Sequence, residues 1–132
     1  MMIEFFMAME HVPTVTHQEK QVTVINGKPI FYEPNELKAA RNKLEAHLAQ
    51  NAPEACLSGP IGLQVKWCFK TIKGHRNGEY RTSRPDTDNL QKLLKDCMTS
   101  VGFWKDDAQV CQEIVEKFWS DIPGIWIRVM QI

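Results

Sequence analysis

The sequence predicts an α+β fold, in which a small mixed β-sheet has about two main helices on one face. Several segments alternate apolar and polar residues, as half-buried strands do, and two others repeat apolar residues at helical spacing. Their order along the chain is strands, helix, strand, helix, strands, which is typical of this class. The chain of 132 residues is long enough to bury a core of its own. We therefore expect residues 1–132 to form a single domain.

The first third of the chain is expected to contain three strands. Residues 1–9 are mostly apolar and are predicted to form the first of them. Residues 21–25 and 28–32 flank the pair Asn26-Gly27, which favours a type I′ turn because both positions need a positive φ. These two segments are therefore predicted to form a β-hairpin.

A helix and a central strand are expected next. Residues 34–49 carry apolar residues at helical spacing, and Pro34 suits the first turn, where its missing N–H costs nothing. Alternate residues from Ile61 to Phe69 are apolar, whereas Lys66 and Lys70 fall on the opposite face. This pattern predicts a half-buried strand with a basic outer face.

A second helix and two closing strands complete the expected fold. Residues 89–101 carry an apolar stripe that predicts the helix, and it consists of Leu90, Leu93, Leu94, Cys97 and Val101. Phe103 and Trp104 follow, and we expect them to be core anchors rather than DNA wedges because aromatic side chains are usually buried. Residues 110–119 and 124–132 are predicted to be strands.

The composition indicates an ordinary soluble protein. Hydrophobic residues make up 43% of the chain and charged residues 24%. No apolar run approaches the ~20 residues of a membrane span, and the apolar start lacks a basic region, so we expect a cytoplasmic protein with no membrane association. The four cysteines show no Cys-x-x-Cys spacing. Reduced thiols are expected, with Cys97 and Cys111 in the core.

The charges are balanced in number but not in position. The formal net charge is zero, which gives no general argument for nucleic-acid binding. The segment from Gln64 to Arg84, however, has only one acidic residue, Glu79, among six basic ones. These are Lys66, Lys70, Lys73, Arg76, Arg81 and Arg84. A basic segment that leads into an acidic cluster suits a nuclease, because one part binds the polyanion and the other binds a metal.

Two aspartates stand one residue apart at the start of the second predicted helix. In an extended segment, residues two apart point the same way, so Asp86 and Asp88 are expected to converge on one point. Carboxylates gathered in this way suit Mg²⁺, a hard cation that prefers oxygen ligands, and divalent metals often serve phosphodiester cleavage. The alternative for Asp88 is a helix N-cap, with Gln91 completing a capping box. Both roles are compatible because a carboxylate has two oxygens.

Lys92, Asp106 and Asp107 extend this cluster. Lys92 follows Asp88 by one helical turn. It is expected either to form an ordinary ion pair with Asp88 or to direct its positive charge toward a phosphate. The predicted helix carries the chain roughly 20 Å away, and the residues from Gly102 to Asp107 span at most about 20 Å. Asp107 therefore meets the first pair only if the chain doubles straight back, if the helix ends earlier, or if a second subunit completes the site.

Two neighbouring motifs resemble a known family. The first runs from Arg84 to Lys92 as Arg-Pro-Asp-x-Asp-Asn-Leu-x-Lys, and the second runs from Gly102 to Val110 as Gly-Phe-Trp-x-Asp-Asp-x-Gln-Val. In this order and at this spacing, they resemble the RusA family of Holliday junction resolvases. Bacteria carry these enzymes, often on prophages. The order of the remaining segments is also similar to that of the family.

The resemblance implies a homodimeric, Mg²⁺-dependent endonuclease that nicks two strands of a four-way junction symmetrically and leaves 5′-phosphate and 3′-hydroxyl ends. Mn²⁺ is expected to substitute for Mg²⁺. Asp86, Asp88 and Asp107 match the essential carboxylates of the family, and Lys92 matches its important lysine. Asp106 matches a common but less critical acidic position. A two-fold dimer suits this substrate because it presents two equivalent sites to a two-fold junction.

The working hypothesis is an endonuclease that resolves Holliday junctions during DNA recombination and repair. Asp86, Asp88 and Asp107 would bind the metal, Lys92 would contact the scissile phosphate, and the six basic residues before the cluster would follow the DNA backbone. One alternative keeps the enzyme class but changes the substrate to other branched or duplex DNA. Another is a junction-binding protein without catalysis, in which the aspartates only cap and turn the chain.

Overall fold

The structure is a computed structural model that describes residues 1–15, 21–32 and 34–132. A four-stranded mixed sheet lies at its centre, with the strand order β1-β6-β4-β5. The strands are β1 (Met2–Ala8), β4 (Ile61–Lys70), β5 (Val110–Ser120) and β6 (Gly124–Gln131). Strand β6 pairs antiparallel with both β1 and β4, whereas β4 and β5 are parallel.

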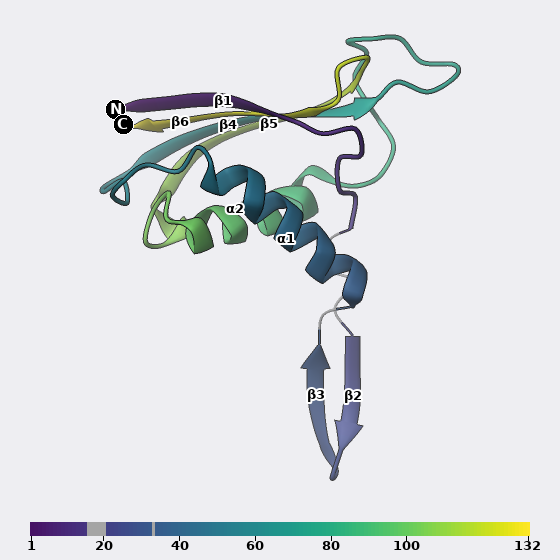
Figure 1. Cartoon of the computed structure of the whole chain (residues 1–132), viewed down its shortest axis with the longest axis vertical. Helices are drawn as coiled ribbons and strands as arrows, with labels where there is room; N and C mark the ends of the chain where they lie inside the picture. Colours follow the sequence, from purple (N-terminus) through teal and green to yellow (C-terminus); the bar gives the residue numbers. More distant parts are fainter. Residues whose placement is uncertain (16–20, 33) are drawn as a thin grey trace.

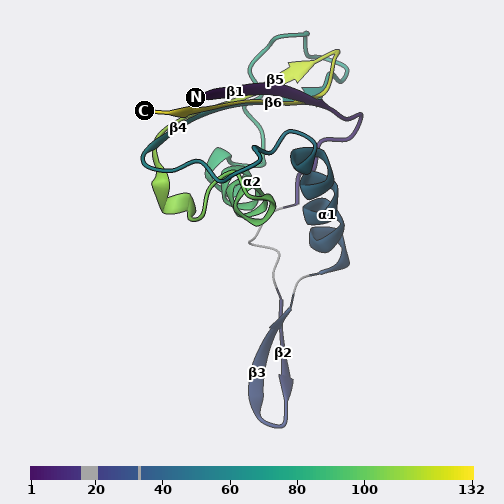
Figure 2. The ribbon, with the colours of Figure 1, turned by 60° about the vertical axis from the view of Figure 1, so that its left-hand side comes forward.

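Two helices cover one face of this sheet. They are α1 (Asn35–Ala49) and α2 (Thr87–Val101), and both lie on the same side in the two ribbon views (Figures 1 and 2). The predicted α+β class, mixed sheet and one-sided helices are therefore confirmed. In the described ranges, none of the helices combines the length and the apolar character that crossing a membrane would need.

The predicted hairpin is confirmed. It consists of β2 (Gln21–Ile25) and β3 (Lys28–Tyr32), which pair antiparallel with Ile25 opposite Lys28. Asn26 and Gly27 both have positive φ, 52° and 76°, as the tight turn between right-twisted strands requires. The hairpin extends away from the sheet and the helices (Figure 2).

The core lies between the sheet and the two helices. In β4, Leu63, Val65 and Trp67 are buried, while Gln64 and Lys66 between them are half-buried on the other face. This confirms the predicted alternation, and β6 contributes Ile125, Ile127 and Val129 to the same core. From the helices and the following turn, the core receives Leu37, Leu44, Leu90, Leu94, Phe103 and Trp104, all at most 2% exposed.

The two cysteines expected in the core behave differently. Cys97 on α2 is fully buried, as predicted, but Cys111 is exposed. The prediction for Cys111 was wrong because β5 is an edge strand of the sheet, and Cys111 lies where the β4–β5 register shifts, so that it has no partner residue in β4. A strand pattern alone does not show which strand lies at an edge.

The chain crosses from β4 to the parallel strand β5 through α2. Helix α2 ends at Gly102, whose φ of 94° is left-handed, a conformation that glycine adopts at little cost. The N–H groups of Gly102 and Phe103 donate to the carbonyl oxygens of Thr99 and Met98. The chain then reverses and forms a short 3₁₀ helix, η2 (Asp107–Gln109), immediately before β5.

Candidate active site

The start of α2 lies two residues earlier than expected and changes the role of Asp88. The N-cap residue is Asp86, with φ −74° and ψ 148°, and its side chain makes no capping hydrogen bond. Its carbonyl oxygen accepts the N–H of Leu90. Asp88 lies inside the first turn, where the helix dipole favours an acidic side chain. The expected capping box of Asp88 with Gln91 was therefore wrong, because both residues already belong to the helix.

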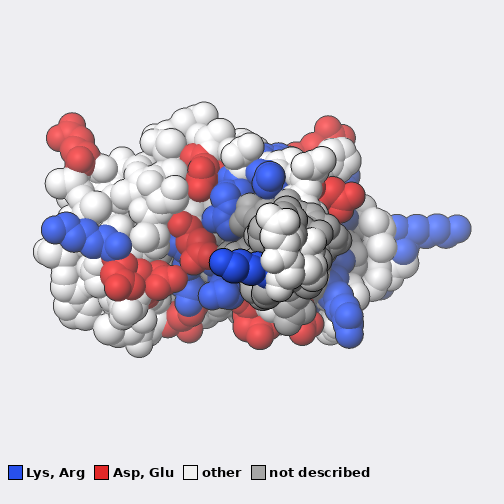
Figure 3. Space-filling view, turned by 90° about the horizontal axis from the view of Figure 1, so that it is seen from below, with Lys and Arg blue, Asp and Glu red and all other residues white. Residues whose placement is uncertain are grey.

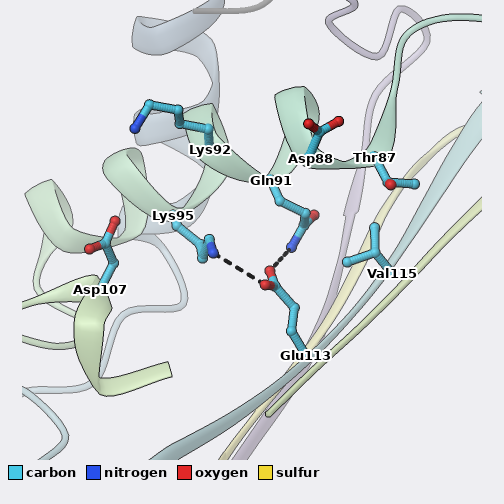
Figure 4. A pocket seen from close by; sticks show the side chains of 8 residues that line it. All are labelled: Thr87, Asp88, Gln91, Lys92, Lys95, Asp107, Glu113 and Val115. Atoms are coloured by element: carbon cyan, nitrogen blue, oxygen red, sulfur yellow. Dashed lines mark hydrogen bonds and ion pairs between the residues drawn. The ribbon is translucent and has the colours of Figure 1, made fainter. Parts of the chain in front are cut away.

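A pocket of about 530 Å³ lies between α2, η2 and β5. It is lined by Thr87, Asp88, Gln91, Lys92, Lys95, Asp107, Glu113 and Val115. Asp88 and Asp107 lie toward opposite ends of it, and Lys92 and Lys95 project from the helix between them (Figure 4). The chain therefore doubles back within one subunit, as the first of the three expected routes requires, and α2 keeps its full length.

Gln91 connects the pocket to the hydrophobic core through two hydrogen bonds. This side chain is only 3% exposed, and its Oε1 accepts the indole N–H of Trp67 at 2.7 Å. Because an indole N–H only donates, the amide must turn its Nε2 toward Glu113 Oε2, also at 2.7 Å. Lys95 Nζ contacts the other Glu113 oxygen at 3.2 Å, and both contacts are drawn in Figure 4.

Glu113 and Lys95 were missed by the sequence reasoning. The only signal for Glu113 was its position two residues before Val115 in a predicted strand, which puts both side chains on the same face of β5; that face lines the pocket. Lys95 lies outside the apolar stripe of the second predicted helix, but nothing in the sequence shows that a carboxylate from β5 contacts it there.

Asp106 and Asp107 have different environments although they are neighbours. Asp106 caps η2, because its Oδ1 accepts the N–H of Ala108 at 2.9 Å and Gln109 Oε1 accepts the N–H of Asp106 at 3.2 Å. The Gln109 amide also donates to the carbonyl oxygens of Leu57 and Gly59, at 3.1 Å each. Asp106 is thus engaged in a capping box, whereas Asp107 lines the pocket.

The donor set of the pocket fits a hard divalent cation. Asp88, Asp107 and Glu113 offer carboxylate oxygens, which Mg²⁺ prefers, and Asp86 lies two residues before Asp88. Among the described residues, however, no three acidic, histidine or cysteine side chains gather closely enough to hold a metal ion together. Mg²⁺ commonly binds through one or two carboxylates and keeps several waters. Binding of Mg²⁺ by only one or two of these carboxylates, with water as the remaining ligands, is consistent with this coordination.

The six basic residues expected to follow DNA do not form one continuous surface. Lys66 lies over the Trp126 ring, 4.9 Å from its centroid, on the sheet face away from the helices. Lys70 Nζ donates to the Asp121 carbonyl oxygen at 3.4 Å, and Lys73 and Arg76 are exposed in the loop after β4. Seen from the hairpin end, acidic and basic side chains are interspersed (Figure 3). DNA contact by all six stays a prediction.

The loop between β4 and α2 is held together by local contacts. The His75 ring stacks on Trp119 with 4.7 Å between ring centroids. The N–H of Arg76 and the His75 ring lower the pKa of Glu79. The Glu116 carboxylate accepts the Tyr80 hydroxyl at 2.8 Å and raises the pKa of that phenol. This loop therefore packs against the edge strand β5 up to the start of the site.

Comparison with known proteins identifies the family. A family model described as Endodeoxyribonuclease RusA matches residues 10–130. The chain is 34% identical to the crossover junction endodeoxyribonuclease rusA of Lactococcus phage r1t, over the whole of both chains. It is 26% identical to the uncharacterized protein YqaN of Bacillus subtilis (strain 168), over 83% of this chain and 84% of that protein.

A third relative matches over a shorter stretch. The crossover junction endodeoxyribonuclease RusA of Escherichia coli (strain K12) is 56% identical over 34 residues, which cover 26% of this chain and 28% of that protein. The family model and the full-length phage relative lead to the same assignment. On these grounds, the chain belongs to the RusA family of endodeoxyribonucleases.

Proposed function

We propose that this protein is a divalent-metal-dependent endonuclease that resolves Holliday junctions by paired symmetric nicks. It acts on branched DNA in the cytoplasm during recombination and repair and leaves 5′-phosphate and 3′-hydroxyl ends. The observation that carries the proposal is the single pocket that Asp88, Lys92 and Asp107 line within one subunit. Membership of the RusA family supports the same substrate class.

Asp86, Asp88 and Asp107 are the proposed metal-binding residues. When bound, Mg²⁺ would lower the pKa of a coordinated water and polarise the scissile phosphate, and Mn²⁺ would substitute for it. Asp106 is the less critical neighbour, since its carboxylate already caps η2. Asp88 and Asp107 line the pocket together with Lys92 and Lys95, so a phosphate that enters meets both kinds of charge. Asp86 does not line this pocket and lies at the N-cap of α2.

Lys92 is the proposed phosphate-binding residue. It projects from α2 between Asp88 and Asp107 (Figure 4), where a cation stabilises the charge that develops on a phosphate under attack. The proposed roles of Lys66, Lys70, Lys73, Arg76, Arg81 and Arg84 are to contact the DNA backbone. A homodimer completes the proposal, because a two-fold protein offers one pocket to each of two symmetry-related strands.

The proposal is tested with labelled four-way junction, flap and linear duplex, each incubated with and without Mg²⁺. The wild type is expected to cut the junction at paired positions only with Mg²⁺. Asp107→Asn and Asp88→Asn should lower the cleavage rate by at least ~100-fold, because the metal that these carboxylates are proposed to bind supplies several kcal/mol of transition-state charge stabilisation. Asp121→Asn, a carboxylate in the exposed turn between β5 and β6, is the matched control and should cut normally.

Two other outcomes would overturn or change the proposal. Junction binding without any cutting by the wild type would leave a non-catalytic junction-binding protein and overturn the proposal. Equal cutting of flap or duplex would keep the nuclease and replace its substrate. That alternative has some support in the interspersed charges of the face seen in Figure 3, which give little long-range preference for one DNA shape.

A further inference from the structure

The three peptide carbonyls just before Asp86 all accept hydrogen bonds from cationic side chains. Lys117 Nζ donates to the carbonyl oxygens of Ser83 and Pro85, at 2.8 Å each. The carbonyl oxygen between them, that of Arg84, accepts from the Arg81 guanidinium. These contacts fix the direction in which the chain enters α2, whose N-cap is Asp86.

Both cations are themselves held by the fold. The Arg81 guanidinium lies between two aromatic rings, 4.4 Å from the Phe69 centroid and 4.6 Å from the Trp119 centroid, where a cation is attracted to each ring face. Its Nε also donates to Ser83 Oγ at 3.1 Å. The backbone N–H of Arg81 donates to the carbonyl oxygen of Lys117 at 2.9 Å, which ties the loop to the edge of β5.

Asp86 lies close enough to Lys117 to influence its charge. Burial and the neighbouring Arg81 lower the pKa of Lys117, while Asp86 raises it. Two like charges in one place repel each other, so the arrangement is stable because carbonyl oxygens, ring faces and a carboxylate surround them. Lys117 directs two hydrogen bonds and Arg81 two more into the chain itself, which is the pattern of residues that hold a backbone in place.

We propose that Lys117 and Arg81 are positioning residues that orient Asp86 for metal binding. This inference rests on the proposed function, in which Asp86 is a metal ligand, and it adds two residues that line no part of the pocket described above. It also gives Arg81 a role different from DNA contact. Residues that hold a metal ligand in place typically change metal affinity or activity by ~10–100-fold when they are lost.

The test compares Lys117→Met with Lys117→Arg. Methionine keeps most of the side-chain volume but loses the charge and both hydrogen bonds, whereas arginine keeps the charge and offers several N–H donors. Lys38→Met is the matched control, because Lys38 is exposed on α1 and its loss changes the net charge equally. Arg81→Lys is a second variant that keeps the charge and loses the planar fork.

Three quantities are measured: Mg²⁺ affinity by calorimetry without DNA, the single-turnover rate of junction cleavage, and junction affinity in EDTA. Lys117→Met is expected to weaken Mg²⁺ binding and slow cleavage by ~10–100-fold each, while junction affinity changes by less than ~3-fold. Lys117→Arg should recover at least half of both losses on a logarithmic scale. Hydrogen exchange is a fourth readout: the amides of Arg84 and of residues 86–88 should exchange faster in Lys117→Met only.

Several results would overturn the inference. One is wild-type Mg²⁺ affinity and amide exchange in Lys117→Met, and another is an equal loss in Lys38→Met. A loss confined to junction affinity would make Lys117 a DNA contact instead. If Lys117→Met proves unfolded by circular dichroism, Arg81→Lys carries the same test. Because calorimetry and hydrogen exchange need no substrate, they remain decisive even if the wild type cuts no junction, so the two proposals fail independently.

Discussion

Gln91 shows how one side chain links the hydrophobic core to the candidate site. It is almost fully buried, yet both ends of its amide are used, one by Trp67 and the other by Glu113. A buried polar group with a partner at each end is tolerated, whereas one that loses a partner costs free energy. The position of Glu113 beside Lys95 therefore depends on an amide anchored in the core.

We expect Gln91→Leu to lower the free energy of unfolding by about 1–3 kcal/mol, because the buried indole N–H of Trp67 is left without an acceptor. Urea denaturation followed by tryptophan fluorescence measures this. Gln64→Leu, on the half-buried outer face of β4, is the control and should change the free energy by less than about 0.5 kcal/mol. Equal changes in the free energy of unfolding of the two variants would show that the hydrogen bond to Trp67 does not stabilise the fold.

At the level of single residues, the sequence predicted which residues line the site better than it predicted the contacts between them. The motif singled out Asp86, Asp88, Lys92 and Asp107. The last three line one pocket, whereas Asp86 does not. The motif did not predict Glu113, Lys95 or the Lys117 contacts, because these arise where β5 comes to lie beside α2. Contacts between segments that are distant in sequence depend on sheet order, which periodicity does not reveal.

At the level of elements, periodicity and turn residues predicted most of the fold. The apolar spacing located α1, β4 and α2, and Asn26-Gly27 located the hairpin. The start of α2 was misplaced because an Asp-x-Asp pair offers two capping residues, and the choice depends on how Lys117 and Arg81 hold the preceding carbonyls. The short η2 was not predicted, since a single turn of helix has no apolar repeat.

The strand pair β1–β6 depends on a glycine at its end. Gly124 lies opposite Ala8 in the register, and a Cβ atom there would lie 2.4 Å from the Met7 carbonyl oxygen and 2.5 Å from the Phe6 ring. By contrast, a Cβ atom at Gly59 would meet nothing within 4 Å. The two positions share a positive φ and differ in the space around them.

We therefore expect Gly124→Ala to be clearly more destabilising than Gly59→Ala. The Gly59 variant should cost about 1–2 kcal/mol from its left-handed backbone alone. The Gly124 variant should cost about 1–3 kcal/mol beyond that, because the β1 backbone must shift. Thermal and urea unfolding of both variants provide the comparison, and equal losses would mean that β1 moves aside without cost.

At the level of the whole molecule, the neutral net charge means that local charges must supply any attraction to DNA. Lys73 and Arg76 are exposed in the loop that extends past the end of the sheet (Figure 1). Each phosphate that a protein neutralises changes the slope of log affinity against log salt by about 0.9. The salt dependence of binding therefore reports how many basic residues contact the backbone.

We expect the double variant Lys73→Gln with Arg76→Gln to reduce that slope by nearly 2 if both contact phosphates. Fluorescence anisotropy with a labelled junction in EDTA, repeated at several salt concentrations, gives the value. The single variant Lys38→Gln on α1 is the control and should leave the slope unchanged. An unaltered slope in the double variant would exclude this loop from the DNA-binding surface.

The parallel pairing of β4 and β5 through α2 has a consequence for how the site can be inherited. Because this crossover returns the chain directly to the pocket, the proposed metal-binding residues and Lys92 all lie in the segment from Asp86 to Asp107, and Glu113 follows shortly after. One short, continuous piece of gene thus encodes the whole reactive centre. Recombination between relatives could exchange that piece in a single event and leave the hairpin and α1 of the recipient unchanged.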